Sequence, residues 1–271
     1  MSKKVAILGG GNIGVAMAKG FTRSGYLKPD NLIITRRHPE HIKDLEKEGY
    51  IITNDNNYAV KNSEIVIVAV RPEQLKSLLD VIKDDVQENK HIIVSVVTGA
   101  TIDFIKSYLG KKVWVFRVMP NTAVAICESM TTISSIDAPE DVRKKVVTLF
   151  SKVGKALEIP EEYIIPATVL CASGIAFFLR VIRAASQGGI EIGFHSDEAI
   201  MMAAQTAKGS ASILLESKGH PESEIDKVTT PRGITIAGLN EMEHNGISSA
   251  LIKGIIVSYK KAVELMQNGK K

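Results

Sequence analysis

The stretch "VAILGGGNIGVAMAKGF", residues 5–21, sets three consecutive glycines between an apolar run and an amphipathic segment. Residues 5–8 are all apolar, which predicts a short buried strand, and residues 12–24 carry apolar side chains at helical spacing. Glycine destabilises regular structure by about 0.5–1 kcal/mol relative to alanine. Its repetition at this junction therefore indicates a turn whose backbone has to be free of side chains.

Three of these glycines fit the pattern G-x-G-x-x-G between a strand and a helix. Gly9 allows the tight turn, Gly11 leaves room for a pyrophosphate against the backbone, and Gly14 lets the helix pack closely on the strand. The N-terminus of the helix adds free N–H groups and a partial positive charge. The stretch predicts a dinucleotide-binding turn, and the alternative is a turn built for packing alone.

The second predicted strand ends in "IITRRH", with Thr35, Arg36 and Arg37 in succession. Sites that prefer NAD place a carboxylate at this position to bind the ribose 2′-hydroxyl. This chain has two guanidinium groups instead, and arginine pairs with phosphate in a fork geometry. We predict NADP(H) as the cofactor, with NAD(H) as a secondary one. An ordinary surface role is the alternative for both arginines, more so for Arg37.

Short apolar runs alternate with amphipathic segments as far as Pro160. The expected strands are 5–8, 31–35, 64–70, 91–97, 113–118, 130–134 and 155–159; the expected helices are 12–24, 38–48, 72–84, 101–109 and 139–152. This alternation predicts a mostly parallel sheet with helices on both faces. We therefore expect an α/β fold whose residues 1–160 form a doubly wound, Rossmann-type domain.

Beyond Pro160 the pattern is helical throughout, which predicts an all-helical C-terminal domain over residues 161–271. The expected helices are 161–188, 196–217, 222–228, 233–243 and 246–267. The segment 163–186 is apolar on most faces, although Arg180 and Arg183 interrupt it. A helix that is apolar all round is normally buried. We expect this one to be buried in a homodimer or a higher homo-oligomer.

The 271 residues are 45% hydrophobic and 24% charged, with a net charge of +4, which is typical of a soluble globular protein. Basic residues alternate with acidic ones, so we expect no nucleic-acid partner. We also expect no membrane span, no signal peptide and no metal site. Two cysteines without metal-type spacing favour a cytoplasmic location. The histidines are interpreted as surface residues without a catalytic role: His38, His41, His91, His195, His220 and His244.

Several motifs resemble those of the pyrroline-5-carboxylate reductases. They are "GGGNIG" (9–14), "DNNYAV" (55–60), "AVRP" (69–72), "RVMPNT" (117–122) and the region 198–243. The resemblance covers essentially the whole chain. It implies NADPH-dependent reduction of the cyclic imine 1-pyrroline-5-carboxylate to L-proline, in proline biosynthesis, by hydride transfer to the C=N bond.

The resemblance also implies a set of cofactor-binding residues on the first domain. The pyrophosphate would meet residues 11–13, the 2′-phosphate Thr35 and Arg36, and the nicotinamide Thr98 and Gly99, near Met119. Asn56 and residues 69–72 would follow the adenosine side. The full set is Gly9, Gly11, Asn12, Ile13, Gly14, Thr35, Arg36, Asn56, Ala69, Val70, Arg71, Pro72, Thr98, Gly99 and Asn121.

For the substrate, the resemblance implies the N-terminus of a helix that begins near residue 234. Backbone N–H groups of Gly233 and Ile234 would bind the carboxylate, and the hydroxyl of Thr235, the catalytic residue, would reach the ring nitrogen. Thr230 and Glu162 would lie beside them, with Glu161 as the alternative to Glu162. A protonated imine is already electrophilic, so the protein mainly has to position the reacting atoms within about 3–3.5 Å.

Two motifs depart from the family pattern. "CASGIA" (171–176) has Cys171, Ala172 and Ile175 where the family has serine, glycine and proline, and "TPRGIT" (230–235) has Arg232 where it has glycine. The altered motifs lie in the substrate region.

Two alternatives therefore stay open. One is a divergent paralogue that reduces another imine or oxo acid, and the other is a non-catalytic dinucleotide-binding regulatory protein. The β-hydroxyacid dehydrogenases share the architecture but need a lysine on the inter-domain helix, and residues 161–188 contain none.

Overall fold

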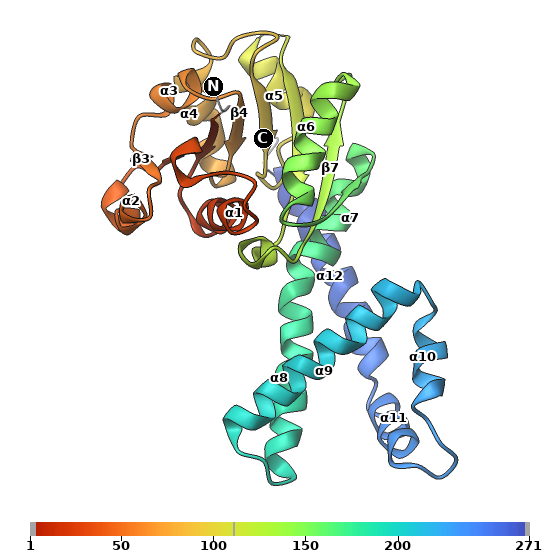
Figure 1. The fold of residues 1–271 in the computed structure, drawn as a ribbon. Helices are drawn as coiled ribbons and strands as arrows, with labels where there is room; N and C mark the ends of the chain where they lie inside the picture. Colours follow the sequence, from red (N-terminus) through yellow and green to blue (C-terminus); the bar gives the residue numbers. More distant parts are fainter. Residues whose placement is uncertain (1–3, 111, 269–271) are drawn as a thin grey trace. The chain divides into compact units, whose positions relative to one another are not determined.

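A computed structural model describes residues 4–110 and 112–268 (Figure 1). The chain forms two compact units. The first unit holds the described residues up to Ser173 and from Tyr259 onward, and the second unit is residues 174–258. The domain boundary at residue 160 stays a prediction.

The first unit is built on one sheet, which has eight strands in the described residues, in the order β3-β2-β1-β4-β5-β6-β7-β8. The strands are β1 Val5–Leu8, β2 Leu32–Thr35, β3 Ile51–Thr53, β4 Ile65–Val68, β5 Ile92–Ser95, β6 Trp114–Met119, β7 Ser129–Ser135 and β8 Gly154–Glu158. All neighbouring strands are parallel except β6 and β7, which are antiparallel. The apolar strands of the sequence thus form a sheet that both layers of helices can cover.

Helices cover both faces of this sheet and bury one apolar cluster on each. Helices α1 and α6 contribute to one cluster, and α3, α4 and α5 to the other. The α-helices are α1 Asn12–Arg23, α2 Asp44–Lys47, α3 Asn56–Lys61, α4 Pro72–Ile82, α5 Ile102–Leu109, α6 Glu140–Ser151 and α7 Ile164–Ala167. Shorter 3-10 segments are η1 Pro29–Asn31, η2 Pro39–Ile42, η3 Thr122–Ile126 and η4 Glu161–Tyr163, and η5 Thr168–Ser173 is a π-helix.

The doubly wound α/β domain predicted from the sequence is confirmed, with differences in the second and third βα units. Strand β3 and helix α3 were not expected, and the helix expected over 38–48 is a 3-10 turn followed by the four-residue α2. Strand β3 has three half-buried residues at the sheet edge, too few for a periodic signal. Helix α3 has six residues and is capped by Asp55, whose Oδ1 accepts the Tyr58 N–H at 2.9 Å. Such short elements depend on capping and edge pairing more than on hydrophobic pattern.

The second unit is all-helical, as expected. Its helices are α8 Gly174–Glu191, α9 Ser196–Ser217, α10 Pro221–Lys227, α11 Ile234–His244 and α12 Ile247–Asn268, and the last turns of α12 belong to the first unit. The single helix expected over 161–188 is divided, because η5 separates α7 from α8. The side chains that periodicity would place on one continuous face therefore change direction at the π-helix.

His91 was expected at the surface, and this is wrong. It lies directly before β5, is fully buried, and its Nδ1 accepts the Gln87 N–H at 2.8 Å. Burial lowers the pKa of His91. The polar residues before it suggested an exposed position, but the imidazole is buried and bonded to the backbone of Gln87. The five other histidines are exposed.

Candidate active site

The glycine turn leaves an open cradle at the N-terminus of α1. Gly9 has a φ of +120°, and a Cβ on it would meet the carbonyl of Ala69. A Cβ on Gly11 would meet nothing within 4 Å. Gly11 caps α1 without a side-chain hydrogen bond, and the first turn of α1 has no acidic residue. The open space and the uncapped helix N-terminus fit a pyrophosphate, so the predicted residues Gly9, Gly11, Asn12, Ile13 and Gly14 lie together.

The turn lies at the point where the strand order reverses. Strand β1 pairs with β2 on one side and with β4 on the other. The N–H groups of Gly9 and Gly10 both donate to the Thr35 carbonyl, at 3.1 and 2.7 Å, and Ala69 N–H donates to the Leu8 carbonyl at 2.8 Å. The segment Ala69–Pro72 therefore borders the cradle. Ligands of open α/β sheets bind at this crevice, outside the carboxyl ends of the strands.

Arg36 reaches back over the glycine turn. Its Nη1 donates to the Gly10 carbonyl at 2.8 Å, and the side chain is half-buried, whereas Arg37 is exposed. Thr35 is buried, and its Oγ1 donates to Asn56 Oδ1 at 2.6 Å. The sequence reasoning placed Thr35 beside Arg36 as a phosphate contact. In the structure the Thr35 hydroxyl holds Asn56, while Arg36 supplies a positive charge beside the cradle.

On the other half of the sheet, Thr98 and Gly99 follow β5 and Asn121 follows β6. Thr98 is exposed, and Gly99 turns the chain with a φ of +86°. Asn121 is buried, its Oδ1 accepts the Ala123 N–H at 3.1 Å, and its Nδ2 donates to the Cys171 carbonyl at 3.2 Å. Both polar atoms of the Asn121 side chain are thus engaged within the protein. Thr98 is the exposed position at this edge, and a Cβ on the half-buried Gly99 would lie 3.5 Å from the Met266 side chain.

The structure distinguishes the two candidate glutamates of η4. Glu161 Oε1 accepts the Ile102 N–H and a hydrogen bond from Arg117 Nη1, both at 2.9 Å. Glu162 is exposed. Arg117 lies in β6 and is 3% exposed. Sequence reasoning missed Arg117 as a functional candidate, although a charge inside a predicted buried strand was the available signal.

Four of the residues predicted for the substrate site, Thr230, Gly233, Ile234 and Thr235, lie together in the second unit at the N-terminus of α11, whereas Glu162 lies in the first unit. Gly233 caps this helix without a side-chain hydrogen bond, and its N–H donates to the Thr230 carbonyl at 2.9 Å. Thr235 is half-buried in the first turn, whereas Ile234 is 93% exposed. The first turn has no acidic residue. The uncapped N–H groups and the dipole of α11 suit a carboxylate.

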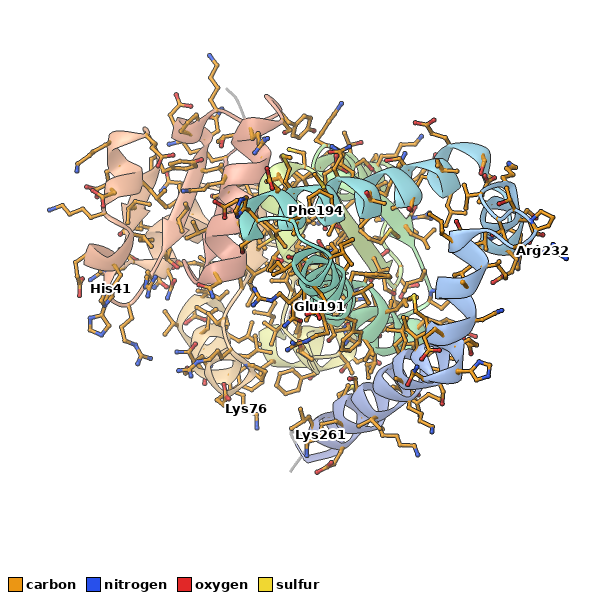
Figure 2. All side chains as sticks on the ribbon, turned by 90° about the horizontal axis from the view of Figure 1, so that it is seen from below. His41, Lys76, Glu191, Phe194, Arg232 and Lys261 are labelled. Atoms are coloured by element: carbon orange, nitrogen blue, oxygen red, sulfur yellow. The ribbon has the colours of Figure 1, made fainter. Side chains whose placement is uncertain are left out.

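Arg232 precedes this helix in a left-handed conformation. Its φ is +59°, and the side chain is exposed at the outer surface of the second unit (Figure 2). A left-handed residue with a Cβ costs about 1–2 kcal/mol. The position therefore suits the glycine that the resembling family has there, and the arginine adds a cation beside the N-terminus of α11.

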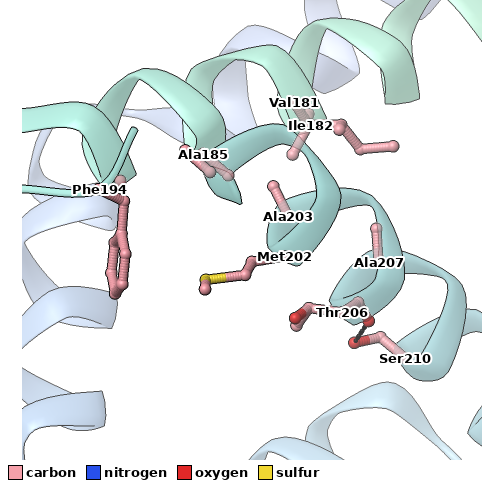
Figure 3. A pocket seen from close by; sticks show the side chains of 11 residues that line it. Val181, Ile182, Ala185, Phe194, Met202, Ala203, Thr206, Ala207 and Ser210 are labelled. Carbon is pink, nitrogen blue, oxygen red and sulfur yellow. Dashed lines mark hydrogen bonds between the residues drawn. The ribbon is translucent and has the colours of Figure 1, made fainter. Parts of the chain in front are cut away.

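Helices α8 and α9 enclose an apolar groove within the second unit (Figure 3). Its lining includes Val181, Ile182, Phe194, Met202 and Ala203. Among the described residues, the stretch Glu161–Glu191 is also long and apolar enough to cross a membrane by length and composition alone. Core helices of soluble proteins share this property.

The cradle at the switch point defines the first unit as the dinucleotide-binding domain of an oxidoreductase. Residues 4–99 match the family model described as NADP oxidoreductase coenzyme F420-dependent, and residues 161–265 match the one described as pyrroline-5-carboxylate reductase dimerisation. The chain is 46% identical to pyrroline-5-carboxylate reductase 2 of Dictyostelium discoideum, over 96% of this chain and 92% of that protein. The chain belongs to the pyrroline-5-carboxylate reductase family.

Two further likenesses agree with this assignment. Pyrroline-5-carboxylate reductase 1 of the same organism is 52% identical over 96% of this chain, which spans about half, 49%, of that protein's length. A crystal structure of Plasmodium falciparum pyrroline carboxylate reductase with NADP bound has a TM-score of 0.87 and 23% identity, and each chain is covered to 98%. This structural likeness shows that the fold is shared over the whole chain.

Proposed function

We propose that this protein reduces 1-pyrroline-5-carboxylate to L-proline with NADPH as the hydride donor. Family membership over nearly the full chain supports the reaction class. The observation that carries the choice of substrate is the turn from Thr230 to Thr235 at the uncapped N-terminus of α11. It offers backbone N–H groups for a carboxylate and a hydroxyl for a ring nitrogen, which are the two polar features of this substrate.

In this proposal each residue positions a part of the reactants. A reduced nicotinamide, when bound, supplies the hydride. The free N–H groups at the start of α11, including that of Ile234, bind the carboxylate, and Thr235 hydrogen-bonds the protonated imine nitrogen. The N–H of Gly233 is held by the Thr230 carbonyl at 2.9 Å and shapes this turn instead. A contact of Glu162 with the substrate stays a prediction. The hydride goes to the imine carbon, and the electron pair of the C=N bond moves to nitrogen, which keeps its proton. No stronger acid is needed, because the imine is already protonated.

We infer NADP(H) rather than NAD(H) from the region after β2. Arg36 lies beside the glycine turn, and the residues that follow β2 include no carboxylate before Glu40. A guanidinium binds a 2′-phosphate through charge-assisted hydrogen bonds, each worth about 1.5–3 kcal/mol. NAD(H) would bind in the same cradle without this contact and therefore more weakly.

We also propose that the protein works as a homodimer or a higher homo-oligomer through its helical unit. The exposed apolar groove between α8 and α9 and the match to a dimerisation model support a second copy as the occupant. This assembly would account for the apolar stretch 161–191 without a membrane. The absence of a nucleic-acid partner and a cytoplasmic location stay part of the proposal.

The test is the oxidation of NADPH with 1-pyrroline-5-carboxylate, measured beside a six-membered ring homologue and an open-chain oxo acid. We expect the five-membered imine to have the highest kcat/KM. Preference for another compound would favour the second candidate, a divergent paralogue. Arg232 favours this alternative, because a cation beside the N-terminus of α11 would suit a larger anion. Cofactor binding without turnover on any of these compounds would favour a regulatory protein.

A further inference from the structure

Arg117 and Glu161 form a buried ion pair outside the residues that sequence reasoning assigned to the cofactor. Arg117 is 3% exposed, and its Nη1 lies 2.9 Å from Glu161 Oε1. Its Nε and Nη2 are buried and have no hydrogen-bond partner among the described residues. Glu161 is therefore the counter-charge that this guanidinium depends on, since a buried charge without a partner is strongly unfavourable.

The same carboxylate oxygen also holds the start of α5. Glu161 Oε1 accepts the Ile102 N–H at 2.9 Å, from a position 59 residues further along the chain. Thr101 Oγ1 accepts the Phe104 N–H at 3.1 Å, so this helix N-terminus has one local acceptor and one distant acceptor. The first N–H groups of a helix lack partners within the helix. Glu161 supplies one and thereby fixes where α5 begins.

A short connection leads from the end of β5 to the anchored start of α5. Val96 N–H donates to the Val68 carbonyl at 3.0 Å, which holds the upstream end. Between these two anchors lie the exposed Thr98 and the half-buried Gly99. In doubly wound folds, β1–β3 and β4–β6 form two mononucleotide-binding halves. The connection after β5 therefore belongs to the half opposite Arg36.

We propose that Glu161, whose charge Arg117 balances, is a positioning residue for the nicotinamide half of the cofactor site. Its hydrogen bond to Ile102 N–H holds the connection with Thr98 and Gly99 in place, and Arg117 supplies the counter-charge for the carboxylate. The inference rests on the proposed function, because it requires a nicotinamide dinucleotide in this crevice. It assigns Glu161 a role other than the substrate contact considered for it, and it leaves that contact to Glu162.

The experiment compares two double variants in the full-length protein, Arg117→Met with Glu161→Gln and Arg117→Met with Glu161→Leu. Both remove the two buried charges, and only the first keeps an oxygen for Ile102 N–H. Calorimetry gives the Kd of NADPH and of 2′-phospho-ADP-ribose, which lacks the nicotinamide. We expect the Leu variant to weaken the binding of NADPH about tenfold more than that of the fragment, which is about the loss of one hydrogen bond to the nicotinamide. In the double variant with Glu161→Gln, the dissociation constants of NADPH and of the fragment should keep their wild-type ratio.

Melting temperature separates this role from a general structural one. Glu161→Gln alone should melt lower than the wild type, because Arg117 loses its counter-charge, yet its ratio of dissociation constants should not change. The control is the exposed pair of Arg143 and Glu158, 3.0 Å apart and with side chains 45% and 41% exposed. The double variant Arg143→Met with Glu158→Leu should change neither the ratio of the two dissociation constants nor the melting temperature appreciably.

The inference would be overturned if the Gln and Leu double variants had the same ratio of the Kd of NADPH to the Kd of the fragment. It would also be overturned if this ratio changed in proportion to the melting temperature in all variants. A wild-type protein that binds neither NADPH nor the fragment would instead contradict the proposed function.

Discussion

The two units differ in where their apolar side chains lie. In the first unit the sheet is covered on both faces, and large residues such as Ile7, Phe21 and Leu79 are fully buried. In residues 174–258 the buried residues are small, namely Gly174, Ser186 and Ala199. Large apolar side chains there are exposed instead, Phe178 to 61% and Leu215 to 68%. The first unit completes its own core, whereas the helical unit needs a further surface to cover its apolar side chains.

The largest effect is expected from a charge in the groove of the helical unit. Ala203→Glu places a carboxylate in the apolar lining between α8 and α9. Burying an unpaired charge at an interface costs several kcal/mol, so light scattering should show the monomer mass at micromolar concentration. The substitution lies in the second unit. If the first unit is complete by itself, the affinity for NADPH should therefore stay within about twofold of the wild-type value, because a surface substitution away from a site rarely changes the free energy there by more than about 0.5 kcal/mol.

Gln205→Glu is the matched control, since it adds the same charge on the same helix at an exposed position outside the lining. It should leave the mass of the assembly unchanged. A wild-type protein that is itself monomeric would contradict the comparison of the two units.

The next effect concerns the cofactor site of the first unit alone. Arg36→Ala should weaken NADPH binding by about 1.5–3 kcal/mol, or about 10- to 150-fold, because the 2′-phosphate loses its cation. NADH affinity should hardly change, since that cofactor lacks the phosphate. Arg37→Ala, at the adjacent exposed position, is the control and should have a small effect on both. Equal losses for the two cofactors after Arg36→Ala would show that Arg36 does not contact the 2′-phosphate.

Thr235→Val tests the proposed substrate site of the second unit. Valine keeps the shape and removes the hydroxyl, so kcat for the imine should fall about 10- to 100-fold, equivalent to about 1.4–2.7 kcal/mol. The affinity for NADPH should not change if the cofactor site and the substrate site are independent of each other. Thr229→Val is the control, because Thr229 Oγ1 donates within the protein, to the Ile225 carbonyl at 2.8 Å. If Thr235→Val keeps full activity and Arg232→Gly loses it, Arg232 rather than Thr235 orients the substrate.

The smallest expected effect is a pH dependence that belongs to the first unit. The pKa of His91 is lowered by burial and by Lys90, and the nearby Asp85 opposes this shift. The unfolded chain therefore binds a proton at a higher pH than the folded chain does. The free energy of unfolding should decrease as the pH falls from about 6.5 toward the lowered pKa, and level off below it. Urea titrations of the wild type and of His91→Asn should converge in this range, and parallel curves would exclude the effect.

The sequence predicted those features that depend on periodicity and on the glycine motif. The strands other than β3 and the helical second half follow from repeated apolar positions, the glycine turn follows from the glycine motif, and these were confirmed. The buried His91 and the pair of Arg117 with Glu161 were not predicted, because each depends on contacts between segments far apart in the chain. Sequence resemblance placed Thr35 and Asn121 at the cofactor, but the hydrogen bonds that engage them inward appear only in the folded structure.

The π-helix η5 has a consequence for how this chain can change by mutation. Each residue of an α-helix turns its direction by about 100°, and a π turn contains an additional residue. Deleting one residue within Thr168–Ser173 would turn this segment into an ordinary α-helical turn, in which each N–H bonds to the carbonyl four residues before it instead of five. The side chains of α8 would keep their spacing along the helix, and none of the groove residues would have to be replaced. The π-helix is therefore a place where the chain can lose one residue without a change in the helical pattern that follows it.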